Sequence, residues 1–300
     1  MTHTREEGAL TEQSLREQYW LALDTATANM TIAIMKGLEA VATNESTVER
    51  NHSVRLLPEI EALLAAVGIR MKDIRAIAAG RGPGSYTGVR IGVTVAKTFA
   101  WSLKLPLIGV SSIGALAFGQ ARLMSQEADH GVTWLVPMLD ARRKQAFTAL
   151  YSWEAASGEA AREEASTDSD GAVEVWHFAE PGLSGIFRQL APDRIALAAE
   201  WTDHLAELYA RTPEDRRPRR IVFAGESEPF APYAERLSER IGLTVSCAEQ
   251  VVHGRDIAWL AWDRLIRGAH DDVHGLVPNY TQLAEAEQKL LARTRQGAGT

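Results

Sequence analysis

The feature of the sequence that most constrains the fold is a glycine-rich loop at residues 81–92, Arg-Gly-Pro-Gly-Ser-Tyr-Thr-Gly-Val-Arg-Ile-Gly. The apolar run at 74–79 before it has the length of a buried strand, and residues 88–103 carry apolar side chains at helical spacing. A second apolar run at 107–110 follows Pro106. A strand, loop, helix and strand in this order predict a βαβ unit with a right-handed connection.

The loop itself is open to two interpretations. Backbone N–H groups freed by Gly82 and Gly84 could converge on a phosphate or carboxylate at the helix N-terminus. Alternatively, the glycines only permit unusual backbone angles, and Ser85 or Thr87 caps the helix. The second interpretation is favoured, because a Walker-type loop ends in Gly-Lys-Ser/Thr and this loop does not.

The predicted helix carries a stripe of very small side chains, because Gly88, Gly92, Ala96 and Ala100 recur every four residues. Two glycines inside a helix cost roughly 1 kcal/mol each relative to alanine. Close approach of another backbone is the simplest reason for their presence. The neighbour could be the sheet beneath, another helix or another subunit.

The loop and several further motifs, in the same order, resemble those of the bacterial TsaB (YeaZ) family. The family's loop signature, Gly-Pro-Gly-Ser-Phe/Tyr-Thr-Gly-x-Arg-Ile-Gly, is matched from Gly82 to Gly92. The other matching segments are 23–27, 52–60, 110–117, 137–142 and 277–280. The resemblance is continuous over about residues 19–151, and so many ordered motifs are far more specific than one glycine-rich loop.

The resemblance implies an α/β chain with two lobes, of the actin, Hsp70 and sugar kinase (ASKHA) type, with mixed sheets flanked by helices. It also implies a role in threonylcarbamoyl transfer to the adenosine next to the anticodon in tRNAs that read codons beginning with adenine. TsaB acts there as the partner of its catalytic paralogue TsaD, together with the ATPase TsaE, and can self-associate as a homodimer. We therefore expect an accessory subunit rather than an enzyme by itself.

The family also suggests roles for individual residues. A helix-on-helix interface is expected from the wide apolar stripe of a helix at 52–67 together with the small-residue stripe. Its residues are His52, Arg55, Leu56, Leu57, Ile60, Gly88, Gly92 and Ala96. The signature loop contributes Gly82, Pro83, Gly84, Ser85, Thr87, Gly88 and Arg90. Asp24, Asp140 and Arg142 are expected at the cleft between the lobes, although Asp140 and Arg142 could instead form an ion pair within their own turn.

The turns that hold nucleotide phosphates in this superfamily are altered. Asp24-Thr25-Ala26 has alanine where close phosphate approach needs glycine, and Asp140-Ala141-Arg142 lacks its glycine likewise. The His-x-x-x-His metal pair of TsaD is also expected to be absent, since His52 is followed four residues later by Leu56. We therefore expect no catalytic residue, cofactor or metal ion in this chain alone, and place ATP and a metal in the partner subunits.

The alternative from another class is an enzyme in its own right, either a small-molecule kinase or a peptidase. A kinase needs an intact phosphate turn, which Ala26 and Ala141 argue against. A peptidase needs a nucleophile with an oriented base, and no local sequence element presents one.

Charge and composition bear on partners and location. The chain of 300 residues has a net charge of −7, whereas a protein that grips tRNA alone is expected to present a concentrated basic surface. We therefore expect contact with tRNA only through the complex. No apolar run approaches the ~20 residues that span a bilayer, and the single cysteine, Cys247, cannot form an internal disulfide. These features predict a cytoplasmic protein without membrane contact.

Composition shifts divide the chain into four parts: an extension at 1–18, expected to be disordered, an N-terminal lobe at 19–128, a C-terminal lobe at 129–280 and a tail at 281–300. Residues 154–171 are rich in Ala, Glu, Ser, Asp and Gly, which predicts a flexible insertion. Further helices are expected at 182–190, 198–209 and 257–266.

Overall fold

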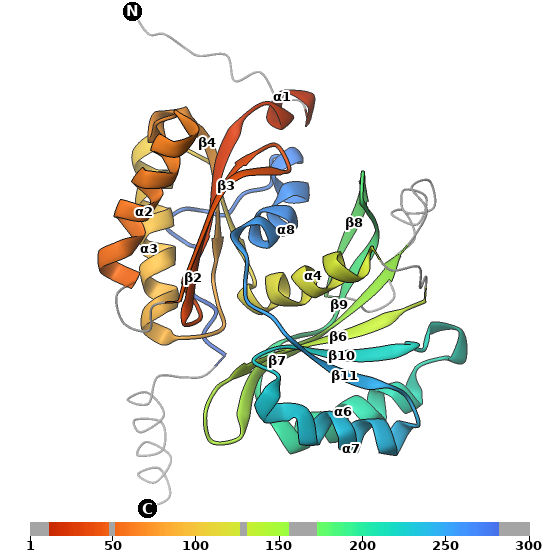
Figure 1. The fold of residues 1–300 in the computed structure, drawn as a ribbon. Coiled ribbons are helices and arrows are strands. Elements are labelled where there is room, and N and C mark those ends of the chain that lie inside the picture. Colours follow the sequence, from red (N-terminus) through yellow and green to blue (C-terminus); the bar gives the residue numbers. More distant parts are fainter. Residues whose placement is uncertain (1–11, 48–51, 127–130, 156–172, 282–300) are drawn as a thin grey trace, which may run out of the picture.

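Two mixed β-sheets organise the chain in the computed structural model, which describes residues 12–47, 52–126, 131–155 and 173–281 (Figure 1). The first sheet has the order β3-β2-β1-β4-β5. Its strands are β1 (Tyr19–Asp24), β2 (Asn29–Lys36), β3 (Glu39–Thr47), β4 (Ile74–Gly80) and β5 (Leu107–Val110). The second sheet has the order β11-β10-β6-β7-β9-β8. Its strands are β6 (Thr133–Asp140), β7 (Gln145–Ala155), β8 (Glu174–Glu180), β9 (Leu183–Leu197), β10 (Arg220–Gly225) and β11 (Val245–Glu249).

The two sheets repeat one topology. In the first, β2 runs antiparallel to both β1 and β3, and β4 runs parallel to β1 and β5. Strands β6, β7, β9, β10 and β11 follow the same pattern in the second sheet, where β8 adds one strand at the edge. This duplication confirms the expected two-lobed fold of the actin, Hsp70 and sugar kinase type.

Helices form three layers around the sheets (Figure 1). They are α1 (Glu12–Arg16), α2 (His52–Val67), α3 (Tyr86–Leu103), α4 (Ser112–Met124), α6 (Ala198–Arg211), α7 (Ala231–Ile241) and α8 (Gly254–Ile266). Helices α2 and α3 cover the outer face of the first sheet, α4 and α8 lie between the sheets, and α6 and α7 cover the outer face of the second. Each layer has its own apolar cluster, and the middle one mixes side chains from both sheets.

The expected lobes at 19–128 and 129–280 share the middle layer of helices. Helix α4 belongs to the first segment but packs against β6, β7, β9 and β10, whereas α8 belongs to the second segment but packs against the strands of the first sheet. In α4, 10 of 13 residues are buried, because a helix between two layers must be apolar nearly all round. Each half of the sequence therefore contributes one helix to the other half.

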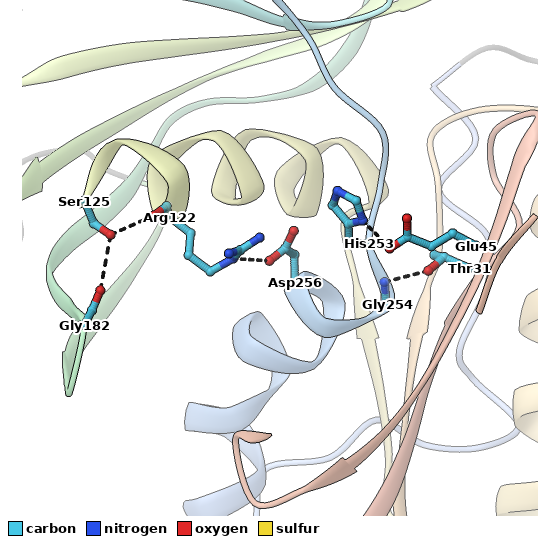
Figure 2. A network of polar contacts seen from close by, with 8 residues as sticks. All are labelled: Thr31, Glu45, Arg122, Ser125, Gly182, His253, Gly254 and Asp256. Carbon is cyan, nitrogen blue, oxygen red and sulfur yellow. Dashed lines mark hydrogen bonds and ion pairs between the residues drawn. The ribbon is translucent and has the colours of Figure 1, made fainter. Parts of the chain in front are cut away.

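Polar contacts hold the crossing from β11 into α8 (Figure 2). The pairs are His253 with Glu45 of β3, Gly254 N with Thr31 Oγ1 of β2, and Asp256 with Arg122 of α4. Asp256 is fully buried, and its carboxylate accepts from Arg122 Nε at 2.8 Å. Burial raises the pKa of Asp256, and the Arg122 charge opposes that rise. The first sheet, α8 and α4 are thus joined by charged groups as well as by apolar packing.

The N-terminal extension is packed from Glu12 onward, so the expected disorder of residues 1–18 is wrong for its last part. Leu15 of α1 is buried in the middle cluster, and the Arg16 guanidinium bonds to the Glu180 carboxylate of β8. Residues 1–11 lie outside the described residues. The expected insertion beyond Ala155 and the tail from 282 onward also lie outside them.

The helix expected at 182–190 is wrong, because this stretch begins the long strand β9. Strand β9 pairs with β7 on one side and with β8 on the other. A short apolar run does not distinguish a strand from a buried helix by periodicity. Pairing with β7 and with the adjacent hairpin strand β8 decides the outcome. The helices expected at 52–67, 198–209 and 257–266 are confirmed within a few residues as α2, α6 and α8.

The small-residue stripe of α3 packs on the chain's own first sheet. A Cβ atom added to Gly88 or Gly92 would overlap with Thr25, directly after β1. Thr25 Oγ1 donates to Gly88 O at 2.7 Å and accepts from Gly92 N at 3.0 Å. This hydroxyl therefore bridges two groups that a regular helix pairs directly. Of the three neighbours that the sequence allowed, the sheet is the correct one.

We expect Gly92→Leu to destabilise the fold itself. A side chain at this position meets the Thr25 hydroxyl inside the protein, and overpacking of this kind costs about 3 kcal/mol. Thr94→Leu is the matched control, because Thr94 lies on the exposed side of the same helix, and its expected change is below ~0.5 kcal/mol. Urea unfolding measures both free energies, and equal losses would contradict the assigned packing.

Candidate functional site

The signature loop closes over the turn that follows β1. Ser85 N donates to Ala26 O at 2.6 Å, and Gly84 lies so close to the same carbonyl that it leaves no room for a Cβ atom. Ser85 Oγ caps α3 by accepting from Gly88 N at 3.3 Å. These backbone donors are used within the chain, which supports the capping interpretation of the loop over the anion cradle.

Asp24 lies beneath this loop and is fully buried. Its Oδ1 accepts from Ala26 N at 2.8 Å, and its Oδ2 accepts from Ser112 Oγ, which in turn accepts from Gly82 N at 2.9 Å. Burial raises the pKa of the carboxyl to about 6, although the bonds from Ser112 and Ala26 oppose the rise. Asp24 therefore presents no surface to the cleft between the lobes, because packing against the loop and α4 buries it completely.

The outer side of the loop is covered in part by the segment after α8. Arg90 lies over the Tyr86 ring, 4.0 Å from its centroid, and its Nε donates to Tyr280 Oη at 2.7 Å. Of the other loop residues, Pro83 is buried and Thr87 is exposed. The loop therefore packs on β1 from inside and contacts the C-terminal segment from outside.

The second altered turn, between β6 and β7, is exposed. Asp140 Oδ1 accepts from Arg142 N at 2.8 Å, and Asp140 N donates to Glu226 Oε2 at 2.8 Å. Within the described ranges, no ion pair joins the Asp140 and Arg142 side chains, so the expected pair is replaced by a bond to the backbone. Neither residue lines the cleft of about 430 Å³ that opens between the sheets. Arg142, Arg143 and Lys144 all have positive φ angles, at 65°, 54° and 61°.

The expected interface residues separate into an inner and an outer group. The buried ones are His52, Leu56, Ile60, Gly88, Gly92 and Ala96. They pack within the chain, against the first sheet and its turns, so their side chains offer almost no surface to another subunit. His52 Nε2, for example, lies 3.3 Å from Ala28 O. Arg55 and Leu57 are exposed as expected, with Arg55 paired to Glu59 at 2.5 Å.

The outward face of α2 and α3 presents large apolar side chains. We define the α2–α3 face by Val54, Leu57, Tyr86, Trp101 and Leu103, which are all exposed. Val54 is 71% exposed, Trp101 65% and Leu57 45%. Figure 1 shows the two helices side by side on the outside of the first sheet. Apolar side chains gathered on one outer layer are typical of a surface that another protein covers.

Sequence reasoning missed a half-buried carboxylate at the cleft between the sheets. Asp193 of β9 accepts hydrogen bonds from Ser111 Oγ at 2.7 Å and from Asn279 Nδ2 at 2.8 Å. Burial raises its pKa, and the bond from Ser111 and the charge of Arg81 oppose the rise. Its partners come from segments far apart in the chain, so only the sequence Pro192-Asp193 within an apolar stretch could have signalled it.

The sequence expectation also overlooked a histidine pair with the metal spacing, His270 and His274. Both residues are exposed in the segment after α8. Among the described residues, no group of three or more His, Cys, Asp or Glu is placed to hold a metal ion. The same residues include no helix that is long and apolar enough to cross a membrane.

The buried Asp24 predicts a pH dependence of stability. Its pKa is about 6 in the folded chain against an ordinary 3.8, so the folded state binds this proton more tightly than the unfolded state. The resulting stability is fully present below about pH 4 and is lost as the pH rises through about 6, by about 3 kcal/mol at most. Asp24→Asn keeps an oxygen to accept from Ala26 N but has no such titration.

Urea unfolding of both proteins at several pH values from 4 to 7 measures this effect. The unfolding free energy of Asp24→Asn relative to wild type should increase across that range, while the other carboxyl groups cancel in the difference. A difference that stays constant with pH would show that burial of Asp24 does not perturb its titration.

Comparisons with known proteins agree with this geometry. The family model described as TsaD, tRNA N6-adenosine threonylcarbamoyltransferase, matches residues 40–288. The tRNA threonylcarbamoyladenosine biosynthesis protein TsaB of Bacillus subtilis is 31% identical over 272 residues, which cover 90% of this chain and 97% of that protein. The TsaB protein of Escherichia coli is 37% identical over 131 residues, or 44% of this chain and 54% of that protein.

A solved structure supports the same assignment. YeaZ from Pseudomonas aeruginosa superposes with a TM-score of 0.60 at 22% sequence identity, over 88% of this chain and 99% of that one. At this identity the likeness shows the fold, and the sequence match to the Bacillus protein shows the family. The chain therefore belongs to the TsaB (YeaZ) family.

Proposed function

We propose that this chain is a non-catalytic partner subunit in threonylcarbamoyl transfer to tRNA, at the adenosine next to the anticodon in tRNAs that read codons beginning with adenine. It pairs with a TsaD-like paralogue, works with a TsaE-like ATPase and meets tRNA only through the complex. ATP and a metal ion belong to the partner subunits. Membership of a family whose members are named tRNA threonylcarbamoyladenosine biosynthesis proteins supports the pathway.

The observation that carries the partner role is the α2–α3 face. Burying a leucine or valine side chain contributes about 1.5–3 kcal/mol, so exposed Val54, Leu57 and Trp101 favour association with another surface. The inner sides of both helices are already packed on the first sheet. Only the outer side of these two helices is therefore free to bind a partner. That partner is a TsaD-like paralogue or, when the paralogue is absent, a second copy of this chain.

The non-catalytic role rests on the turn after β1. The Ala26 carbonyl is bonded to Ser85 N, and Gly84 packs directly against it. A phosphate approaching this turn would have to displace the loop. The second turn also lacks its glycine and carries Arg142 instead. Both features argue against the alternative of a stand-alone kinase.

Leu57→Glu tests the interface. A carboxylate at this position would be desolvated without a partner on association, so we expect binding to the TsaD-like protein to weaken at least tenfold (~1.4 kcal/mol). Leu123→Glu on α4 is the matched control, because Leu123 is also 45% exposed but lies away from α2 and α3. Size-exclusion chromatography and calorimetry of the complex give the comparison. The α2–α3 face would be ruled out as the binding surface if both variants weakened binding equally. It would also be ruled out if neither variant weakened binding.

Reconstitution tests the function itself. We expect the TsaD-like and TsaE-like proteins of the same source to modify tRNA at a steady rate only when this chain is present, and calorimetry with ATP and Mg²⁺ to show no micromolar binding to the chain alone. Equal modification without the chain would overturn the partner role. Micromolar, magnesium-dependent ATP binding would revive the kinase alternative.

A further inference from the structure

The cleft between the sheets has a polar lining that the partner role does not use. Its volume is about 430 Å³, which is within the range of small-molecule sites. Its walls come from the end of β4, from β5, from the start of α4, from β7, β8 and β9, and from α8 with the segment after it. None of the residues that the sequence singled out as site residues lines it. The cleft is thus separate from the α2–α3 face and from both altered turns.

The Asp193 carboxylate fixes one wall of the cleft. In addition to Ser111 and Asn279, Tyr151 Oη and Gln189 Nε2 each lie 3.3 Å from its Oδ1 and donate to it. Four neutral donors therefore supply hydrogen bonds to this half-buried carboxylate. Asp193 consequently acts as a positioning residue for the wall and is not left open to bind a cation.

Arg81 lies at the same wall, and its charge is close enough to Asp193 to lower the pKa of that carboxyl. No ion pair or side-chain hydrogen bond engages the Arg81 guanidinium among the described residues, and its Nε is buried there without an acceptor. A buried donor left without an acceptor is destabilising. The described part of the chain therefore provides no acceptor for Arg81 Nε, and a ligand could provide one.

The second arginine of the cleft is already engaged. Arg264 Nη2 donates to Asp271 Oδ1 at 3.0 Å, and its Nη1 donates to Gly109 O at 3.2 Å. Asp271 Oδ2 in turn accepts from Gly109 N at 2.7 Å. Arg264 and Asp271 thus neutralise each other at the edge of β5, whereas the fork of Arg81 stays available. A guanidinium fork matches the two oxygens of a carboxylate or a phosphate.

The remaining wall combines the aromatic ring of Trp176 and apolar Leu260 with the carboxylate of Glu174. Trp176 of β8 and Leu260 of α8 line it together, with Trp176 Nε1 donating to Leu260 O at 3.1 Å. The indole nitrogen is therefore satisfied within the chain, and the ring offers surface rather than a donor. A ligand of this cleft would place an anionic group at one wall and carbon atoms at the other.

We propose that the cleft binds a small organic anion whose carboxylate or phosphate group pairs with Arg81. Residues of both sheets line the cleft and would surround the ligand. The wall beside the anion is formed by Asn279 and Ser111, which both donate hydrogen bonds to Asp193. The proposal goes beyond the partner role and is independent of it, because it concerns a ligand of the isolated chain.

Two probes separate the two anionic groups. Inorganic phosphate and succinate are titrated into the full chain at constant ionic strength, with heat and tryptophan fluorescence as readouts. We expect saturable binding of one or both: phosphate alone indicates a phosphate ligand, and succinate alone indicates a carboxylate ligand. Binding of neither probe at millimolar concentration would overturn the proposal.

Variants locate the binding. Arg81→Gln should lower the affinity for the probe at least tenfold, and Arg81→Lys should lower it less, because the charge stays while the fork is lost. Arg211→Gln is the matched control, since this α6 arginine has a side chain that is 78% exposed and does not line the cleft. We expect it to change the affinity less than twofold. Unchanged affinity in Arg81→Gln would overturn the proposal.

A loss of folding is not expected in these variants, because Arg81 contributes to the fold through its backbone. Its N–H donates to Val110 O at 2.8 Å, and its carbonyl accepts from Asn279 N at 2.6 Å. Urea unfolding checks this for each variant. If Arg81→Gln is unstable, Arg81→Lys serves as the test, and an affinity equal to that of wild type would again contradict the role of the fork.

Discussion

Insertion of the Thr25 hydroxyl into the first turn of α3 is the contact on which the N-terminal half of the molecule depends. It bridges Gly88 O and Gly92 N, and both positions must be glycine because Thr25 occupies the space of a side chain. The contact brings the start of α3 against the end of β1. The signature loop is thereby held over the turn, where Ser85 N reaches Ala26 O. Burial of Asp24 and the lack of room for a phosphate follow from the same contact.

The sequence predicted those parts of the fold that local patterns determine. The spacing of apolar residues is enough to predict the βαβ unit around the glycine-rich loop and helix α2. The observed bounds of these elements agree with the predicted bounds within a few residues. The small-residue stripe could also be seen in the sequence. The element that packs against this stripe could not be predicted, because small residues allow close approach equally well by a sheet, a helix or another subunit. A choice among these needs the position of Thr25, 63 residues before Gly88.

The parts that the sequence did not predict depend on pairing and packing between segments rather than on the period of one segment. Strand β9 is a strand because β7 and β8 flank it, and its own apolar run is compatible with a helix. Helix α4 packs against the second sheet and α8 against the first. The apolar residues of these helices can be seen in the sequence, but the sequence does not assign either helix to a particular sheet. Asp193 joins donors from α4, β7, β9 and the C-terminal segment. No single stretch of sequence contains that group of residues.

Arg81 of the cleft leads through the signature loop to α3, yet coupling between the cleft and the α2–α3 face should be weak. The side chain of Arg81 lines the cleft, and its backbone leads directly into the signature loop. A ligand can shift another site only by the difference in its affinity for two arrangements of the chain. Here the loop is held independently, through Ser85 to Ala26 and through Thr25 to α3. An anion at Arg81 would therefore act first on Asn279, which bonds both to the Arg81 carbonyl and to Asp193. The loop and the outer surface of α3 would stay in place, so ligand binding and partner binding can vary separately on this fold.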